Sequence, residues 1–220
     1  MARILITRPL RRAHKFSQAL ITRGVRKGDI IHAPVIEIQP TPGAPDVRSF
    51  DGIICSSLYG VPNQGHGLPF YCVGQSTAQA ATQAGFHVRH VSATVAELKT
   101  VLENANLPNL LYLRGAYVTD RLENLATSHV AYVQIPCPVS AQILDRIAEG
   151  GPVIAPLFSA RSARLLFSQL RAGTNLRPVV ISHTVAQIAA DAGYVGETAP
   201  HPTVDAMQIA VFRLWSDTGS

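Results

Sequence analysis

The sequence predicts an α/β protein made of two similar lobes, each a parallel sheet flanked by helices. Short continuous apolar runs each end in a polar turn that opens a helical stretch. This is typical of βαβ units whose strands are covered on both faces. In addition, one series of motifs occurs twice, about half the chain apart. The chain has 220 residues, of which 47% are hydrophobic and 15% charged, enough for two small cores.

The predicted strands share an apolar character and a length too short for a helix. They are Arg3 to Ile6, Gly52 to Cys55, Phe70 to Val73, Leu110 to Leu113, Val153 to Leu157 and Pro178 to Ile181. Three helices are predicted from their start and stop signals. Ser76 or Thr77 caps Ala78 to Ala84, which Gly85 ends; Thr184 opens a helix that Gly193 ends; and Ser162 to Leu170 is amphipathic.

Two segments rich in proline stand apart from this alternation. They are His32 to Pro42 and Ala131 to Ser140, at matching places in the two halves. Proline disfavours helix and imposes extended backbone. We expect the two segments to pair and to form the hinge between the lobes.

The repeated series has the order Arg-turn, Ser-turn, Gly/Ser-turn and Thr-Val. Its pairs are Ile6-Thr7-Arg8 with Tyr112-Leu113-Arg114, Cys55-Ser56-Ser57 with Leu157-Phe158-Ser159, Val73-Gly74 with Ile181-Ser182, and Thr94-Val95 with Thr203-Val204. Two similar lobes that face each other would form a cleft, and these polar turns would line it.

The turns are suited to binding anions. A parallel sheet holds its ligand at the carboxyl ends of its strands, where the N–H groups of helix N-termini point. Arginine can hold a carboxylate through two hydrogen bonds. The candidate binding residues are Arg8, Ser56, Ser57, Gly74, Thr77, Arg114, Gly115, Ser159, Ser162, Ser182 and Thr184. The alternative is structural: most serines and threonines at helix starts only cap the helix, and Arg8 could form a surface ion pair.

Several other classes of function lack their signature. The eight histidines are scattered, and Cys55, Cys72 and Cys137 form no CxxC, so we expect reduced thiols and no metal. No phosphate loop, dinucleotide fingerprint or acid–base dyad is present. No apolar run approaches the length of a membrane span, and the N-terminus lacks the apolar middle of a signal peptide. We therefore expect a cytoplasmic protein without a membrane partner.

The chain is basic, with a formal charge of +5 and a pI near 9.4. Much of the positive charge lies before residue 28. This balance favours a polyanionic partner. A nucleic acid and a small polycarboxylate both fit the charge, but no aromatic–basic signature of nucleic-acid binding is present. The charge alone leaves both partners open, and a solvated helix face is the structural alternative for most of these basic residues.

The turns, in this order and spacing, resemble those of the uroporphyrinogen-III synthase family over almost the whole chain. The matching pieces are Ile4-Leu5-Ile6-Thr7-Arg8-Pro9, Ile53-Ile54-Cys55-Ser56-Ser57 with Val61, Val73-Gly74 with Thr77-Ala78, Leu113-Arg114-Gly115, Phe158-Ser159 with Ser162-Ala163, Ile181-Ser182 with Ala186, and Pro202-Thr203. Each piece is short, and the specificity lies in their order.

The resemblance implies two flavodoxin-like lobes. Residues 1–34 and 139–220 would form a terminal lobe, and residues 40–132 a central lobe. Residues 35–39 and 133–138 would be the linker strands. Each Arg-turn would then share a lobe with the Ser- and Thr-turns of the other half of the repeat.

The resemblance also implies an activity. The family acts on hydroxymethylbilane, a linear tetrapyrrole with eight carboxylates, expelling water, inverting the D ring and closing uroporphyrinogen III. Such an enzyme would be a cofactor-independent hydro-lyase whose partner is a small polycarboxylate and not a nucleic acid, and we expect a monomer. Pro136 stands where the family usually carries a tyrosine that assists loss of the hydroxyl. Tyr117 and Tyr59 are the catalytic candidates in its place. The alternatives are a two-lobe module that binds a tetrapyrrole without turnover, and a basic nucleic-acid binder.

Overall fold

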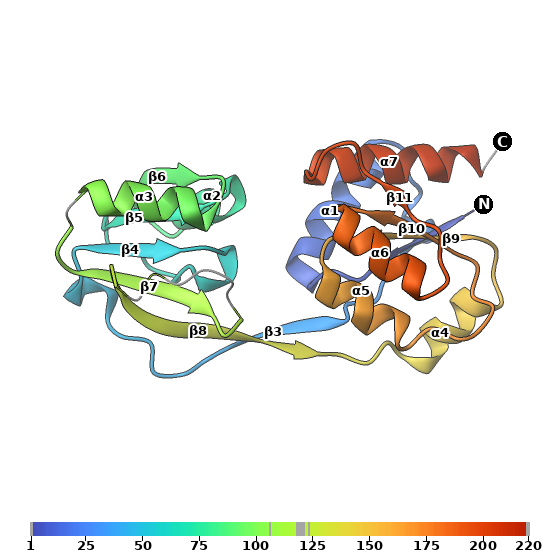
Figure 1. The fold of residues 1–220 in the computed structure, drawn as a ribbon, viewed down its shortest axis with the longest axis horizontal. Helices are drawn as coiled ribbons and strands as arrows, with labels where there is room; N and C mark the ends of the chain where they lie inside the picture. Colours follow the sequence, from blue (N-terminus) through green and yellow to red (C-terminus); the bar gives the residue numbers. More distant parts are fainter. Residues whose placement is uncertain (1, 106, 118–121, 123, 219–220) are drawn as a thin grey trace. The chain divides into compact units, whose positions relative to one another are not determined.

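The computed structural model describes residues 2–105, 107–117, 122 and 124–218. The chain separates into two compact units. Unit 1 comprises Met1–Glu37 and Pro136–Ser220, and unit 2 comprises Ile38–Ile135. The prediction of an α/β protein with parallel sheets flanked by helices is confirmed (Figure 1). None of the helices in the described ranges combines the length and apolar character that crossing a bilayer requires.

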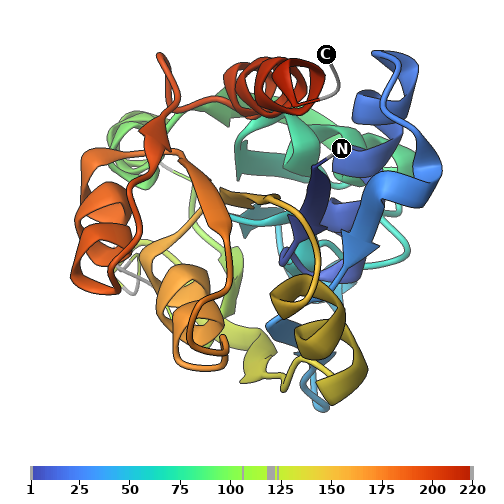
Figure 2. The same cartoon turned by 90° about the vertical axis from the view of Figure 1, so that its right-hand side faces the viewer.

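The sheet of unit 1 has five strands in the order β11-β10-β9-β1-β2, and every neighbouring pair is parallel. The strands are β1 (Arg3–Ile6), β2 (Ile30–His32), β9 (Val153–Leu157), β10 (Leu176–Val180) and β11 (Glu197–Thr198). The helices are α1 (Leu10–Thr22), α4 (Ala141–Ala148), α5 (Ala160–Phe167), α6 (His183–Asp191) and α7 (Val204–Asp217), with the 3₁₀ turn η1 (Lys27–Asp29). Helices α1 and α7 pack together on one face, and α5 and α6 on the other (Figure 2).

Residues Leu10–Thr22 form helix α1 because their buried side chains lie on one face that packs into the core of unit 1. Its buried residues Ala13, Phe16, Ser17 and Leu20 recur at the spacing of one helix face. That face packs in one cluster with Ile4 of β1 and with residues of β9, β10 and α7. The continuous apolar character of β1 and β9 follows from coverage of both faces of the sheet.

The sheet of unit 2 has the order β3-β8-β7-β4-β5-β6. The strands are β3 (Ile36–Pro40), β4 (Gly52–Cys55), β5 (Pro69–Val73), β6 (His87–Ser92), β7 (Leu110–Gly115) and β8 (Thr127–Pro136). From β8 to β6 every neighbouring pair is parallel. The helices are α2 (Gln75–Gln83) and α3 (Val95–Ala105), with the 3₁₀ turns η2 (Val47–Ser49) and η3 (Leu58–Gly60).

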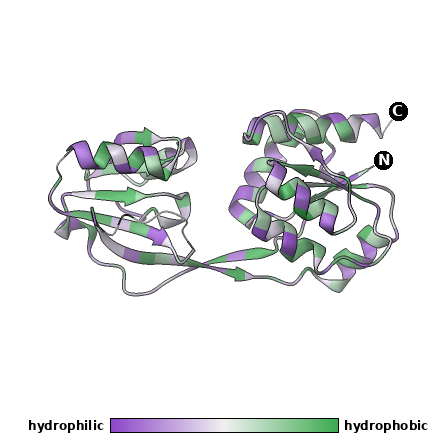
Figure 3. Cartoon of the chain, viewed as in Figure 1, coloured by the Kyte–Doolittle hydropathy of each residue, from purple (hydrophilic) through white to green (hydrophobic). Residues whose placement is uncertain are grey.

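Helices α2 and α3 cover opposite faces of this sheet. Ile53 and Cys55 lie in one cluster with residues of α2, whereas Ile54 lies in another with Leu98 and Leu102 of α3. Successive side chains of a strand point to opposite faces. The unbroken apolar run of β4 therefore has a partner on both sides, and Figure 3 shows β4 as largely hydrophobic and α3 as mixed.

Strands β3 and β8 contain the two points where the chain passes between the units. The Thr41 N–H donates to the Ala131 carbonyl, and the Cys137 N–H donates to the Val35 carbonyl. Residue numbers rise along one segment as they fall along the other, so the two run antiparallel. Both proline-rich segments are thus extended and paired.

The six predicted strands are present, with ends that differ by up to two residues. The predicted start of α2 was wrong. It begins at Gln75, and its N-cap is Gly74, with φ +81° and no side-chain cap hydrogen bond. A positive φ is open to glycine, so the chain turns from β5 directly into the helix. Ser76 and Thr77 then lie inside the first turn.

The other two helix starts also shift by one or two residues. Helix α6 begins at His183 with Ser182 as N-cap, and α5 begins at Ala160 with Ser159 as N-cap. Gly85 and Gly193 follow α2 and α6 closely, both with φ +84°, which confirms them as stop signals.

The two sheets present the repeated motifs in the same spatial order. The Arg-turn strand lies beside the Ser-turn strand, which lies beside the Gly/Ser-turn strand: β1-β9-β10 in unit 1 and β7-β4-β5 in unit 2. In each sheet the Arg-turn therefore comes from one half of the repeat and the other turns from the other half.

Candidate functional site

Unit 1 gathers three of the predicted turns at one edge of its sheet. Arg8 follows β1, Ser159 follows β9 and Ser182 follows β10, and parallel strands end at the same edge. The guanidinium carbon of Arg8 lies 3.8 Å from the centre of the Phe158 ring. This cation–π contact joins the Arg-turn to the Ser-turn.

The serines of unit 1 differ in how far their hydroxyls are engaged. Ser159 Oγ accepts from the Ser162 N–H at 3.2 Å and donates to Ser162 Oγ at 2.9 Å. The Ser159 hydroxyl therefore caps α5, as the structural alternative predicted, and the Ser162 hydroxyl is engaged by Ser159. Ser182 makes no side-chain cap hydrogen bond in the described chain, and Thr184 is exposed. Among the candidate hydroxyl groups of unit 1, those of Ser182 and Thr184 are consequently more available to a ligand than those of Ser159 and Ser162.

Unit 2 gathers the remaining candidates at the equivalent edge. Ser56 and Ser57 follow β4, Gly74 follows β5, and Arg114 and Gly115 end β7. Ser56 Oγ lies 3.0 Å from the Tyr112 hydroxyl. Ser57 Oγ accepts from the Tyr59 N–H at 3.5 Å and caps η3.

Arg114 is held by its own unit. Its Nε donates to Ser128 Oγ at 2.8 Å, and its Nη1 donates to the Gly115 carbonyl at 3.1 Å. The guanidinium therefore has a set orientation before any ligand arrives, which lowers the entropic cost of binding an anion.

Two unit 2 candidates are largely buried. Thr77 is 3% exposed in the first turn of α2, so its side chain presents little surface to a ligand. Gly115 is buried, and a Cβ there would lie 2.7 Å from Cζ of Tyr132. Gly115 is thus required by the close approach of Tyr132, whatever its contact with a ligand.

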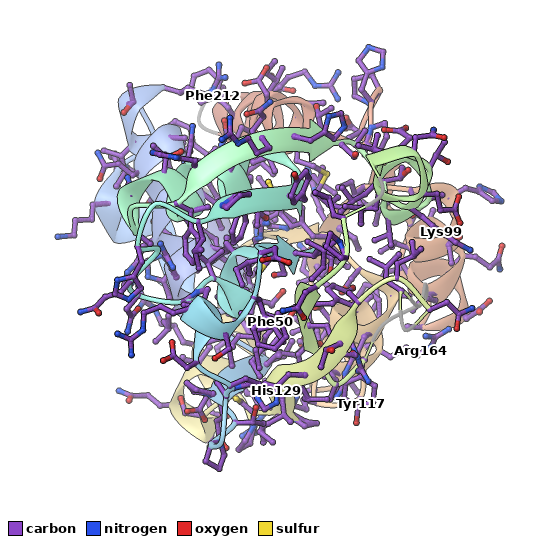
Figure 4. All side chains as sticks on the ribbon, turned by 90° about the vertical axis from the view of Figure 1, so that its left-hand side faces the viewer. Phe50, Lys99, Tyr117, His129, Arg164 and Phe212 are labelled. Carbon is purple, nitrogen blue, oxygen red and sulfur yellow. The ribbon has the colours of Figure 1, made fainter. Side chains whose placement is uncertain are left out.

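The two candidate catalytic tyrosines have opposite environments. Tyr117 is 64% exposed, two residues after Gly115 (Figure 4). The hydroxyl oxygen of Tyr59 is buried, and its ring lies 5.8 Å from the ring of Tyr132. Of the two, Tyr117 is the one whose side chain is mostly exposed to solvent.

Comparison with known proteins assigns the family. The family model described as uroporphyrinogen-III synthase HemD matches residues 15–208. The chain belongs to the uroporphyrinogen-III synthase family. No curated protein sequence matches it significantly.

Solved structures of this family share the fold. Uroporphyrinogen-III synthetase from Helicobacter pylori is 16% identical, with a TM-score of 0.68, covering 97% of this chain and 100% of that one. A mutant uroporphyrinogen III synthase from Thermus thermophilus is 16% identical, with a TM-score of 0.50, covering 99% and 100%. At this identity the likeness concerns the fold.

Sequence reasoning missed three residues that hold the synthase-family turns in place. Phe158 lies under Arg8, Ser128 holds Arg114, and Tyr112 contacts Ser56. Phe158 and Tyr112 belong to the repeated motifs, and their position one or two residues before a polar turn was the available signal. Ser128 carried none, because its partner lies on a neighbouring strand.

A histidine pair lies beside the Arg8 turn. The rings of His14 on α1 and His32 on β2 have centroids 5.0 Å apart, and His32 pairs with Ile6 in the sheet. Burial, and then the nearby His14, lower the pKa of His32 below its usual 6.5. The folded protein therefore binds fewer protons than the unfolded chain as pH falls below that value.

We expect the free energy of unfolding to decrease as pH falls through 6.5 toward the lowered pKa of His32. His32→Gln removes the titrating group and is expected to flatten this dependence. Urea unfolding at a series of pH values measures it, with His201→Gln, an exposed position of the same unit, as control. An unchanged slope in His32→Gln would contradict the assignment.

Proposed function

We propose that this chain is a uroporphyrinogen-III synthase. It converts hydroxymethylbilane to uroporphyrinogen III by losing water, inverting the D ring and closing the macrocycle, without a cofactor. Its family membership over residues 15–208 carries the proposal. The polar turns at the carboxyl edges of both sheets support it, because they suit a substrate rich in carboxylates.

We further propose that the units are two flavodoxin-like lobes. Residues 1–34 and 139–220 would form the terminal lobe, and residues 40–132 the central lobe. Numbered along the chain within unit 1, its strands have the order 2-1-3-4-5, as in flavodoxin. The strands β8-β7-β4-β5-β6 carry the motifs in the same spatial order. Residues 35–39 and 133–138, within or next to β3 and β8, would serve as the linker.

The binding residues divide by role. Arg8 and Arg114 supply positive charge, and Ser56, Ser182 and Thr184 supply half-buried or exposed hydroxyls. Glycine at the N-cap of α2 leaves open space where a side chain would stand, since an added Cβ at Gly74 meets nothing within 4 Å. A carboxylate can therefore approach the first N–H groups of α2.

The reaction requires the protein to position the substrate more than it requires a strong base. When the hydroxyl leaves as water, the pyrrole nitrogen supplies the electrons and a cationic intermediate remains. Unaided, the linear substrate can close to the type I isomer. Holding carboxylates on several rings fixes which carbon meets the cationic end, and this orientation accounts for the acceleration. Tyr117, exposed beside the Arg114 turn, is the proposed proton donor to the hydroxyl.

The isomer of the product tests the proposal. Purified protein is incubated with hydroxymethylbilane, and the oxidised products are separated into types I and III. We expect type III in excess over the spontaneous type I, rising with protein concentration, with heat-denatured protein as control. Type I alone at high protein concentration would refute the proposal.

A second candidate is a two-lobe module that binds a tetrapyrrole without turnover. Pro136 at the place where the family usually carries a tyrosine favours it. Tight binding of uroporphyrinogen III, measured by equilibrium dialysis, together with type I product alone would select this candidate over the enzyme.

A further inference from the structure

Tyr112 is a fully buried residue whose hydroxyl meets a candidate binding residue. It lies on β7 and is 0% exposed. Its Cα pairs with that of Ile54 on β4, two residues before Ser56. Tyr112 belongs to an apolar cluster with Ile54 and Leu98. The ring is therefore clamped among apolar side chains, and its hydroxyl lies 3.0 Å from Ser56 Oγ.

Either hydroxyl can donate in this hydrogen bond, and the surroundings favour Tyr112 as the donor. Burial, as the largest cause, raises the pKa of Tyr112, so the phenol keeps its proton at neutral pH. A buried hydroxyl that cannot place its proton on an acceptor loses free energy. Among the residues that the structure describes, Ser56 Oγ is the acceptor within reach, and a serine hydroxyl can accept while it donates its own proton.

We propose that Tyr112 is a positioning residue that donates to Ser56 and thereby directs the Ser56 proton outward, toward a substrate carboxylate. This inference rests on the proposed function. Ser56 is half-buried at the carboxyl end of β4, so its oxygen can meet Tyr112 on one side and a ligand on the other. A donor oriented in advance needs no reorganisation when the anion binds.

Arg114 supports this inference independently. It stands two residues after Tyr112 on β7 and therefore on the same face of the sheet. Ser128 holds its Nε at 2.8 Å, as Tyr112 holds Ser56. A charged donor on β7 and a neutral donor after β4 are thus each oriented by a side chain of a neighbouring strand, and this arrangement suits a carboxylate.

Tyr112→Phe tests the proposal because it removes the hydroxyl and keeps the ring. We expect KM for hydroxymethylbilane to rise about threefold to tenfold, the loss of one oriented hydrogen bond, with kcat within about twofold of wild type. Tyr71→Phe is the matched control: Tyr71 packs against the same cluster from β5 and should leave KM unchanged. A lowered stability of Tyr112→Phe with wild-type KM would reduce Tyr112 to a structural role and overturn the proposal.

A double-mutant cycle shows whether Tyr112 acts through Ser56. We expect Ser56→Ala to raise KM, and Ser56→Ala with Tyr112→Phe to have the KM of Ser56→Ala alone. If KM of the double variant rose by the product of the two single-variant factors, the proposal would be overturned. If Tyr112→Phe does not fold, Ser56→Thr decides, since it retains the hydroxyl and should keep KM near wild type while Ser56→Ala does not. Equal KM values for those two variants would overturn the proposal.

The wild-type assay separates the two levels of inference. Type I product alone from wild type refutes the proposed function. Type III product from wild type, with an unchanged KM in Tyr112→Phe, refutes only the role of Tyr112.

Discussion

Phe16→Ala is expected to lower the free energy of unfolding by about 3–5 kcal/mol, the usual cost of emptying a buried aromatic site. Phe16 is 0% exposed on the inner face of α1 and packs with Ile4 and Met207 in the core of unit 1. Its ring also meets Phe158 edge to face, with centroids 5.3 Å apart. Urea unfolding measures the loss.

The same variant is expected to weaken substrate binding. Phe158 supports the Arg8 guanidinium, so a cavity at Phe16 removes one wall that keeps Phe158 in place. We expect KM for hydroxymethylbilane to rise as well. Phe212→Ala is the control, because Phe212 is only partly buried against the same core and does not contact Phe158 among the described ring pairs. If Phe16→Ala and Phe212→Ala lowered the free energy of unfolding equally, the particular role of Phe16 beside Phe158 would be contradicted.

Arg8→Ala is expected to raise KM for hydroxymethylbilane about 5-fold to 150-fold, which corresponds to a charged contact of about 1–3 kcal/mol. Arg8 follows β1 at the carboxyl edge of unit 1, with its guanidinium over Phe158. The side chain is half-buried, so we expect only a small change in stability. Steady-state kinetics and urea unfolding of the same preparation separate the two effects.

Arg8→Lys distinguishes charge from geometry. Lysine keeps the charge but lacks the planar group that stacks on a ring and holds a carboxylate through two bonds. An intermediate KM is expected. Arg213→Ala is the matched control in unit 1, because Arg213 is exposed and pairs with Glu197. Wild-type KM in Arg8→Ala would remove Arg8 from the proposed site.

Local signals predicted the elements better than their ends. The strand Gly52 to Cys55 was predicted as the structure has it, because a four-residue apolar run between polar turns leaves little choice. The start of α2 was not. Gly74, Ser76 and Thr77 each suit an N-cap, and the backbone angle of Gly74 decided among them.

The candidate site was predictable in part. Arg8, Ser159 and Ser182 stand at strand ends in the sequence, and parallel pairing brings them to one edge. The capping role of Ser159 and the burial of Thr77 were not readable, because they depend on the direction of each side chain in the folded protein.

From the sequence alone came the alternation of strands and helices, the repeated turns and the fit to an anionic ligand, since apolar periodicity and turn chemistry act over a few residues. Only the tertiary structure decided which turn lies beside which. Arg8 and Phe158 are far apart in the chain, as are Ser56 and Tyr112, and each pair meets because the β1–β9 and β4–β7 pairings bring their strands together. Strand order is set by packing across the whole chain, and no local pattern encodes it.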